Sequence, residues 1–255
     1  MILYIPTYGR TRQQVTLNTI PEIIRKRVVL VVYEEEAHAF PGQHIMVVPK
    51  DVKGIAAKRQ FIMENHDVAL FGPHIVMLDD DLRFFTRRLD DPTKFEKSSD
   101  DDVIDMFNEI GTQLLEFGHV GILGREGGNR ITEEFVYNTR MMRVLAYDTN
   151  LFRHLGIDFR RGGNMCDFDV TLQYLRKGYP NCVCAKWVQD QGTSNAPGGC
   201  SITRTPEVQT ADAQRLHDNH PQFVELVTKT TKTAWGGQGR TDVQVQWKRA
   251  FNADR

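Results

Sequence analysis

Short apolar runs recur along the first part of the chain, and they are rich in β-branched side chains. They show no polar alternation, which is typical of strands buried on both faces of a sheet. The strands predicted in this way are Ile2–Ile5, Val28–Tyr33, Ile45–Val48 and His74–Leu78.

Segments with apolar residues at a helical spacing separate these runs. They predict one helix over Thr11–Arg25 and another from about Gly54 to Glu64. Strands that alternate with helices imply βαβ units with right-handed crossovers. The pattern therefore predicts an α/β, Rossmann-like fold with a mixed, mainly parallel sheet flanked by helices.

The pattern becomes more polar in the second part of the chain. In chain order it predicts a loop over Arg87–Asp102, a helix capped at Ser98–Asp100, strands at Val120–Leu123 and Arg143–Tyr147, a helix over Asp167–Lys177 and a helix near Ala211–Lys229. Beyond Ala185, glycine, polar and basic residues become more frequent. We therefore expect a core over residues 1–185 and a C-terminal extension over residues 186–255.

Composition excludes several classes of protein. The 255 residues are 40% hydrophobic with a formal net charge of −1, so no global field draws the chain to nucleic acid or to a membrane. The N-terminus lacks the features of a secretory signal, and no stretch approaches the roughly 18 apolar residues of a membrane span. We expect a soluble, cytoplasmic protein with no membrane partner.

The cysteines form no CxxC pair, which favours reduced, mostly buried thiols at Cys166, Cys182, Cys184 and Cys200.

Three consecutive aspartates, Asp79, Asp80 and Asp81, follow the fourth predicted strand. Ligands of parallel sheets gather at this edge. Alternation along a strand would turn Asp79 and Asp81 to one side and Asp80 to the other. A Mg²⁺ or Mn²⁺ ion between Asp79 and Asp81 would relieve the repulsion between their carboxylates. The triplet predicts a divalent-cation site at Asp79 and Asp81; the alternative is a solvated acidic turn.

Other candidate groups flank the triplet. Lys58 and Arg59 follow small residues at a helix start, where they can pair with phosphates, although such a pair is also common on a protein surface. Asp167 and Asp169 fall in the first turn of a predicted helix, so one can cap it while the other serves as a base; both are alternatively ordinary first-turn acids. His217, one helical turn before a second histidine, is a candidate metal or diphosphate ligand, with an exposed histidine as the alternative.

The sequence lacks the motifs GxxxxGK[ST], HExxH, GxSxG and GxGxxG. Kinase, zinc protease, esterase and dehydrogenase functions therefore lose their usual support.

Five short segments, taken in order, make residues 1–185 resemble GT-A fold glycosyltransferases. They are Pro6-Thr7-Tyr8, Glu34-Glu35, Ala57-Lys58-Arg59, Asp79-Asp80-Asp81 and Cys166-Asp167-Phe168-Asp169. The resemblance implies a nucleotide-sugar-binding catalytic core, a UDP-sugar donor and a Mn²⁺ or Mg²⁺ cofactor. The usual acidic pair is Cys166-Asp167 here, which leaves inversion or retention at the anomeric carbon open.

The resemblance also implies roles for individual residues. Catalysis would fall to Asp167, the acceptor-side base, and the metal to Asp79 and Asp81. The residues themselves add Asp169 as a second catalytic candidate and His217 as a further metal ligand. The remaining donor contacts would come from Thr7, Tyr8 and Arg10 at the nucleoside, Glu34 or Glu35 at its base, Lys58 or Arg59 at the diphosphate, and Asp79 and Asp80 near the ribose.

Segments of the C-terminal third look similar to phage-encoded, TET-associated glycosyltransferases, which modify hydroxymethylated pyrimidines such as hydroxymethylcytosine in DNA. The segments are Asn195–Gly199, Arg204-Thr205, Leu216–Val224 and Gln246–Phe251. The resemblance implies DNA as acceptor, the host cytoplasm as compartment, and an extension that completes the acceptor side.

Basic and aromatic residues are interleaved in two places, as a channel for an extruded base requires. The candidate DNA-binding residues are Arg83, Arg87, Arg88, Lys232, Trp235, Arg240 and Lys248. The alternative is a solvated surface with core tryptophans.

Two other functions remain open at this point. A sugar-1-phosphate nucleotidyltransferase can share the sheet architecture, but Tyr8–Arg12 offers only one glycine for its phosphate loop. A non-catalytic nucleic-acid-binding module with a degenerate site is the third interpretation.

Overall fold

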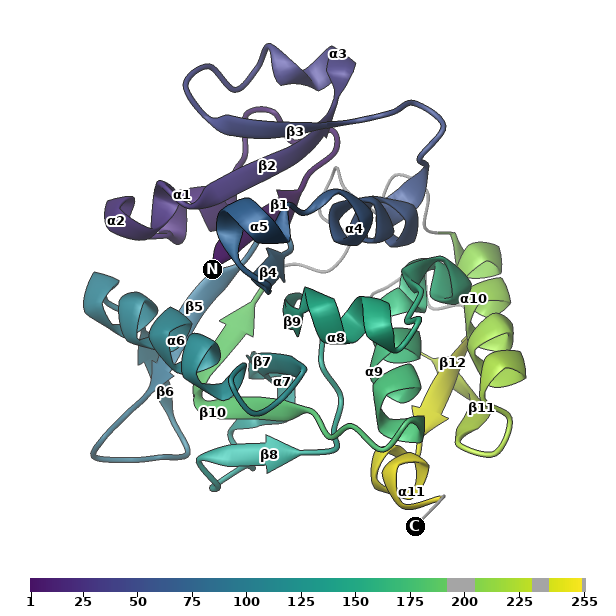
Figure 1. Ribbon diagram of the computed structural model, residues 1–255. Helices are drawn as coiled ribbons and strands as arrows, with labels where there is room; N and C mark the ends of the chain where they lie inside the picture. The colour runs from purple at the N-terminus through teal and green to yellow at the C-terminus, as the bar shows by residue number, and fades with distance from the viewer. Residues whose placement is uncertain (192–204, 231–238, 254–255) are drawn as a thin grey trace.

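The computed structural model describes residues 1–191, 205–230 and 239–253. A ten-stranded sheet runs through the molecule in the order β3-β2-β1-β4-β9-β7-β10-β5-β6, and β8 pairs with β10 (Figure 1). The strands are β1 (Ile2–Pro6), β2 (Val28–Tyr33), β3 (His44–Val48), β4 (His74–Leu78), β5 (Arg83–Arg87), β6 (Phe95–Lys97), β7 (His119–Gly124), β8 (Phe135–Tyr137), β9 (Val144–Asp148) and β10 (Cys182–Asp190).

The first half of the sheet is parallel. β3, β2, β1 and β4 pair in parallel, β9 pairs antiparallel with both β4 and β7, and β10 is parallel to β7. β1, β2, β3, β4, β7 and β10 therefore all point the same way, and their carboxyl ends share one edge. The predicted α/β fold with a mixed, mainly parallel sheet is confirmed.

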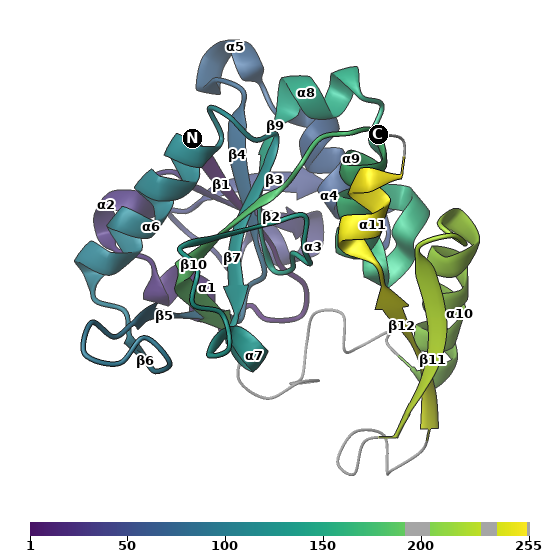
Figure 2. The same ribbon diagram turned by 90° about the horizontal axis from the view of Figure 1, so that it is seen from below.

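Helices cover both faces of the sheet (Figures 1 and 2). One face packs against α1 (Val15–Thr19), α2 (Glu22–Arg25) and α6 (Asp100–Gln113), and the other against α4 (Gly54–Asn65), α8 (Thr149–His154) and α9 (Cys166–Arg176). Shorter helical segments are α3 (Glu34–Ala37), α5 (Val68–Phe71), α7 (Arg125–Gly128) and a 3-10 turn over Phe159–Met165. No helix in the described ranges is long and apolar enough to cross a membrane.

A small C-terminal unit packs on α9, beside the main sheet (Figure 2). It consists of α10 (Pro206–Asn219), the antiparallel pair β11 (Val224–Thr230) and β12 (Gly239–Val245), and α11 (Trp247–Asn252). Leu172 and Leu175 of α9 share a buried cluster with Leu216, Val224 and Val243 of this unit.

Proline explains two differences between the predicted and observed helices. The segment Thr11–Arg25 forms two helices because Pro21 disfavours helical backbone at the residue before it, where α1 stops. The helix expected near Ala211–Lys229 ends at Asn219, shortly before Pro221, and the chain continues as β11. The polar loop expected over Arg87–Asp102 contains the second strand of the β5–β6 hairpin.

The sheet buries a titratable histidine. His119 on β7 has no exposed surface and stacks between Tyr147 and Tyr174, with ring centroids 4.5 and 5.3 Å away. Its Nδ1 lies 3.2 Å from the carbonyl oxygen of Ala146, and its Nε2 lies 3.2 Å from Thr171 Oγ1. Burial lowers the pKa of His119 from 6.5 to about 3.

We expect His119 to make the fold acid-sensitive. Between pH 6.5 and pH 3 the unfolded chain binds a proton at this position and the folded chain does not, so stability falls as the pH drops through this window. This difference in proton binding lowers the free energy of unfolding by about 2–3 kcal/mol between pH 7 and pH 4.5. Urea unfolding at both pH values should show a smaller acid loss for His119→Phe than for the unaltered protein or for His44→Phe, a substitution on exposed β3. An equal loss in all three proteins would contradict the prediction.

Candidate active site

Three consecutive aspartates lie in the turn that follows β4. Arg59 Nη2 lies 2.8 Å from Asp79 Oδ1, whereas Arg10 contacts both Asp80 and Asp81, with 2.9 Å between Arg10 Nη1 and Asp81 Oδ2. Asp80 is buried, whereas the side chains of Asp79 and Asp81 both keep part of their surface exposed. Asp80 and Asp81 share one guanidinium group and Asp79 faces another, so a cation between Asp79 and Asp81 stays a prediction.

Asp80 fastens the loop after β1 to the end of β4. It is buried, and Thr7 Oγ1 donates a hydrogen bond of 2.6 Å to its Oδ2. Gln14 Nε2 donates in turn to Thr7 Oγ1 at 2.9 Å. Burial raises the pKa of Asp80, and the hydrogen bond from Thr7 and the charge of Arg10 oppose that rise. The side chains of Thr7 and Arg10 thus hold a carboxylate of the protein itself, and their contact with a nucleoside stays a prediction.

Asp79 and Asp81 fit a divalent cation in part. Their side chains are 31% and 20% exposed, and each gives one oxygen to an arginine. Within the described ranges no three histidine, cysteine, aspartate or glutamate side chains are grouped so that they could hold a metal. Mg²⁺ commonly binds one or two carboxylates and takes its other ligands from water and phosphate. The two aspartates therefore suit an ion that arrives with a diphosphate, rather than a complete cage.

The basic pair at the start of α4 points into the protein. Lys58 and Arg59 are 4% and 5% exposed, so the alternative of an ordinary surface pair is wrong. Lys58 Nζ donates to the carbonyl oxygen of Thr7 at 2.8 Å and lies 3.9 Å from the centroid of the Tyr33 ring. Burial opposes the charge on Arg59, but Cys166 and Asp79 outweigh it and raise the pKa of the guanidinium.

At the end of β2 the structure singles out an acidic residue that the sequence did not. Glu36 Oε1 accepts a hydrogen bond of 2.7 Å from the backbone of Gly9, whereas Glu34 and Glu35 are exposed. Tyr8, at 42% exposure, packs edge to face on Tyr33. Three adjacent glutamates in one turn of α3 carry no sequence signal that separates them. Glu36 therefore holds the loop after β1, and the base contact of Glu34 or Glu35 stays a prediction.

Asp167 lies at the beginning of α9, beside the same arginine as Asp79. Its Oδ1 accepts a hydrogen bond of 3.1 Å from the backbone of Phe168, and neither it nor Asp169 caps the helix. Burial raises the pKa of Asp167, while Arg59 and Arg140 oppose the rise. A carboxylate with a raised pKa near two cations can accept a proton from a hydroxyl group. Its role as the base stays a prediction.

Asp169 has a different environment. It has no exposed surface, and its Oδ1 accepts hydrogen bonds from Asn219 at 3.1 Å and lies 2.9 Å from His220 Nε2. Gln173 Nε2 donates to its Oδ2 at 2.5 Å. Asp169 therefore joins α9 to the end of α10, and a fully enclosed carboxylate with these partners does not suit the predicted catalytic role.

His217 also belongs to the C-terminal unit. Its Nδ1 lies 2.7 Å from the carbonyl oxygen of Val224, at the turn between α10 and β11. The described residues place it in no group that could hold a metal. The prediction that His217 shares a metal with Asp79 and Asp81 therefore lacks a structural basis.

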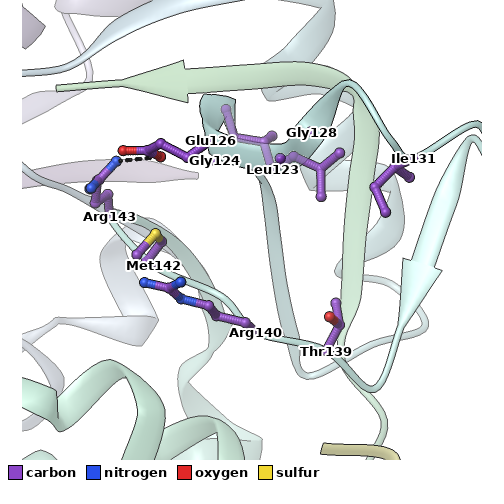
Figure 3. A pocket seen from close by; sticks show the side chains of 11 residues that line it. Leu123, Gly124, Glu126, Gly128, Ile131, Thr139, Arg140, Met142 and Arg143 are labelled. Carbon is purple, nitrogen blue, oxygen red and sulfur yellow. Dashed lines mark ion pairs between the residues drawn. The ribbon is translucent and has the colours of Figure 1, made fainter. Parts of the chain in front are cut away.

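A cavity of about 380 Å³ opens between β7 with α7 and the segment that leads into β9 (Figure 3). Its lining comprises Ile122, Leu123, Gly124, Glu126, Gly127, Gly128, Ile131, Thr139, Arg140, Met142 and Arg143. Arg143 Nη1 lies 3.5 Å from Glu126 Oε2 and 3.1 Å from Gln189 Oε1. Sequence reasoning missed Arg140 and Arg143, because a single arginine next to a predicted strand resembles any other surface arginine.

The predicted DNA-binding residues differ in how exposed they are and in which groups they contact. Arg83 and Lys248 are exposed. Arg87 instead donates hydrogen bonds to the carbonyl oxygens of Ala185, Pro92 and Gly128, so it ties the hairpin to the sheet rather than reaching for a phosphate. Arg88 pairs with Asp90 and Arg240 with Asp242. Lys232 and Trp235 lie outside the described residues.

The cysteines agree with the sequence-based expectation where they are described. Cys166, Cys182 and Cys184 are buried thiols that form no disulfide with any described residue. Arg59 Nη1 donates to Cys166 Sγ at 3.3 Å, which places this thiol beside the aspartate cluster. Cys200 lies outside the described residues.

Comparison with known proteins identifies relatives. Residues 1–199 match the model of a family described as TET-associated glycosyltransferase. The chain is 23% identical over 241 residues to the beta-glucosyl-HMC-alpha-glucosyl-transferase of Enterobacteria phage T2, covering 86% of this chain and 80% of that protein. The protein of the same name from Enterobacteria phage T6 is 23% identical over 239 residues, with the same coverage.

Among solved structures, S. aureus TarS 1–349 is similar with a TM-score of 0.47 and 14% sequence identity. The match covers 86% of this chain and 66% of that one.

Proposed function

Because this chain belongs to the TET-associated glycosyltransferase family, we propose that it moves a sugar from a UDP-sugar to the hydroxymethyl group of a modified pyrimidine in phage DNA. We propose further that the transfer depends on a divalent cation at Asp79 and Asp81. Glycosyl transfer itself follows from the family, and the donor, the metal and the acceptor are the parts that require an experiment.

The observation that carries the proposal is the meeting of two aspartates of one sheet edge around Arg59. Asp79 is bound to Arg59 at 2.8 Å, and the same arginine opposes the pKa rise of Asp167. The turn after β4 and the start of α9, which carry these aspartates, lie far apart in sequence. Such a pairing suits a transfer reaction, in which the diphosphate leaves near Asp79 while the acceptor hydroxyl group loses its proton to Asp167.

The proposed chemistry uses few groups. The acceptor hydroxyl oxygen forms a bond to the anomeric carbon, the bond from that carbon to the diphosphate oxygen breaks with its electron pair, and the hydroxyl proton passes to Asp167. A divalent cation, when bound, would neutralise charge on the departing diphosphate. Arg59 and Arg10 hold the aspartates in place.

The names of the relatives support the choice of acceptor. The phage T2 and T6 proteins are called beta-glucosyl-HMC-alpha-glucosyl-transferases, and this chain aligns with 80% of each. We therefore include both a free and a glucosylated hydroxymethyl group among the acceptors to be tested.

We expect the purified protein to add a hexose to DNA that contains hydroxymethylated pyrimidine. The assay incubates UDP-sugars and Mn²⁺ with DNA carrying hydroxymethylcytosine, β-glucosyl-hydroxymethylcytosine or hydroxymethyluracil, and mass spectrometry of the nucleosides measures the product. Unmodified cytosine DNA and a reaction with chelator are the controls. Intact donor hydrolysis with every nucleoside unchanged would refute the acceptor, and full transfer in chelator would refute the metal. Pyrophosphate release from a nucleoside triphosphate would point to nucleotidyl transfer instead.

A further inference from the structure

The cavity beside α7, called the α7 cavity below, has the size and chemistry of a ligand site. Its volume of about 380 Å³ falls in the usual range for small-ligand pockets, roughly 300–1,000 Å³. Leu123, Ile131 and Met142 provide apolar and polarisable surface, while Glu126 and Arg143 provide the opposite charges at its rim. Figure 3 shows the two walls facing each other, with Arg140, Met142 and Arg143 on one side and Leu123 to Ile131 on the other.

The α7 cavity adjoins the aspartates. The backbone N–H of Asp79 donates a hydrogen bond of 3.0 Å to the carbonyl oxygen of Arg143. On the other side, the guanidinium carbon of Arg140 lies 4.8 Å from the ring centroid of Phe168, the residue after Asp167. One short segment of cavity wall thus connects the predicted metal ligand with the predicted base. A molecule in the cavity would lie next to both ends of the proposed reaction.

Arg143 is held in an unfavourable backbone conformation. Its φ is 65°, in the left-handed region that residues other than glycine rarely adopt. Such conformations are strained and are concentrated at functional sites. Here it keeps the Arg143 side chain at the cavity while the backbone of the same residue binds Asp79. Glycine would adopt this φ without strain, so the presence of arginine here points to a role for its side chain.

Arg143 still has donors to offer. Its Nη1 is shared by Glu126 and Gln189, whereas its Nε and Nη2 make no hydrogen bond within the part of the chain that the structure describes. Arg140 likewise makes no ion pair or hydrogen bond with any described residue; its contact is the Phe168 ring. The cavity therefore presents one carboxylate beside unused guanidinium donors.

This order of groups matches one pyrimidine better than the other. The pairing edge of cytosine carries a donor, the amino group, followed by two acceptors at N3 and O2. A carboxylate accepts from the amino group, and a guanidinium group donates to neighbouring acceptors. Uracil and thymine alternate acceptor, donor and acceptor, so an oxygen would face the carboxylate. Glu126 and Arg143 are therefore complementary to cytosine.

Resting on the proposed function, we infer that the α7 cavity receives the acceptor base, extruded from DNA, and that Glu126 and Arg143 select a cytosine-type base over a uracil-type base. An extruded base is commonly recognised by hydrogen bonds to its pairing edge and by stacking on apolar side chains. Met142 and Leu123 supply apolar surface on which the base can stack. Specificity for the base thus arises in the segments 123–128 and 139–143, outside the donor site.

The experiment compares transfer to DNA containing hydroxymethylcytosine and hydroxymethyluracil, with donor hydrolysis measured in parallel. The variants are Glu126→Gln, Arg143→Asn and Arg143→Gly, and the controls are Glu116→Gln and Arg27→Asn, both at exposed positions away from the cavity. Asparagine and glycine tolerate a positive φ, so the backbone of each Arg143 variant should stay unstrained, and the loss of stability should be limited to the hydrogen bond with Gln189. Urea midpoints verify that.

Both Arg143 variants should lower kcat/KM for hydroxymethylcytosine DNA by about tenfold to a hundredfold, the usual effect of losing a bidentate base contact. Donor hydrolysis should remain unchanged, because the donor site is intact. Glu126→Gln should lower the preference for hydroxymethylcytosine over hydroxymethyluracil by about tenfold or more. The controls should match the unaltered protein.

Normal transfer by both Arg143 variants would overturn the inference, and so would an unchanged base preference in Glu126→Gln. A parallel loss of donor hydrolysis in the Arg143 variants would also overturn it, since that result assigns the residue to the donor. If the unaltered protein hydrolyses the donor but modifies no base, the proposed function fails, and that failure is visible before any variant is made.

Discussion

The Asp81→Asn variant is expected to lose sugar transfer and donor hydrolysis together, each by a factor of about 10²–10³, a loss typical of removing one electrostatic contact to the charge that develops in a transition state. Both reactions break the same bond to the diphosphate, so a defect at the leaving group affects them equally. The fold should survive, because Arg10 keeps its contact with Asp80.

The measurement is kcat/KM for transfer and for hydrolysis over a series of Mn²⁺ concentrations. Asp90→Asn is the matched control, since that aspartate is 66% exposed and its arginine partner lies on the surface of the hairpin. We expect the control to retain full turnover. Full turnover of Asp81→Asn in the presence of chelator would show that neither the aspartate nor a cation assists the departure of the diphosphate.

The Asp169→Ala variant is expected to lose about 3–5 kcal/mol of stability, the usual result of removing one partner of a buried charged network. His220, Gln173 and Asn219 would each lose a partner that is shielded from water. Because this network joins α9 to α10, the C-terminal unit should detach at lower urea concentration than the sheet.

Urea unfolding followed by tryptophan fluorescence measures this effect, since Trp247 packs on Phe168 of α9. Asp218→Ala, an exposed change near the end of α10, is the control and should be nearly neutral. Asp169→Asn tests catalysis separately, because it keeps the shape and part of the hydrogen bonding. We expect this variant to transfer sugar normally once folded. Loss of transfer in a well-folded Asp169→Asn protein would restore Asp169 to the catalytic residues.

Much of the parallel half of the sheet could be predicted from the sequence. The runs at Val28–Tyr33 and His74–Leu78 are strands with those bounds, because a strand buried on both faces must be apolar throughout. The helix after Ser99 was equally accessible, since its capping box is formed by neighbouring residues. Each of these elements is determined by residues that are neighbours in the sequence, so the sequence alone predicts it.

The orientation of the site residues could not be predicted in the same way. Strand alternation predicted that Asp80 turns away from its neighbours, but its partner Arg10 lies 70 residues away along the chain and could not be predicted. The pairing of Asp169 with His220 spans 51 residues, and the sequence showed only an acid in a first helical turn. The positive φ of Arg143 had no composition signal, because glycine or asparagine would be the expected residue there. Charged contacts between distant segments are set by packing, which local patterns do not encode.

The position of β10 bears on how the chain is made. Its first residues pair with β7 and β8, and its last residues pair with β7 and β5, so three strands synthesised earlier all depend on it. Until this segment leaves the ribosome, those strands keep unpaired edges that can associate with other chains. The expected boundary at residue 185 falls inside β10, between its contacts with β8 and β5. A fragment that stops there would lack the strand that closes the sheet, and the smallest unit able to complete the sheet extends at least to Asp190.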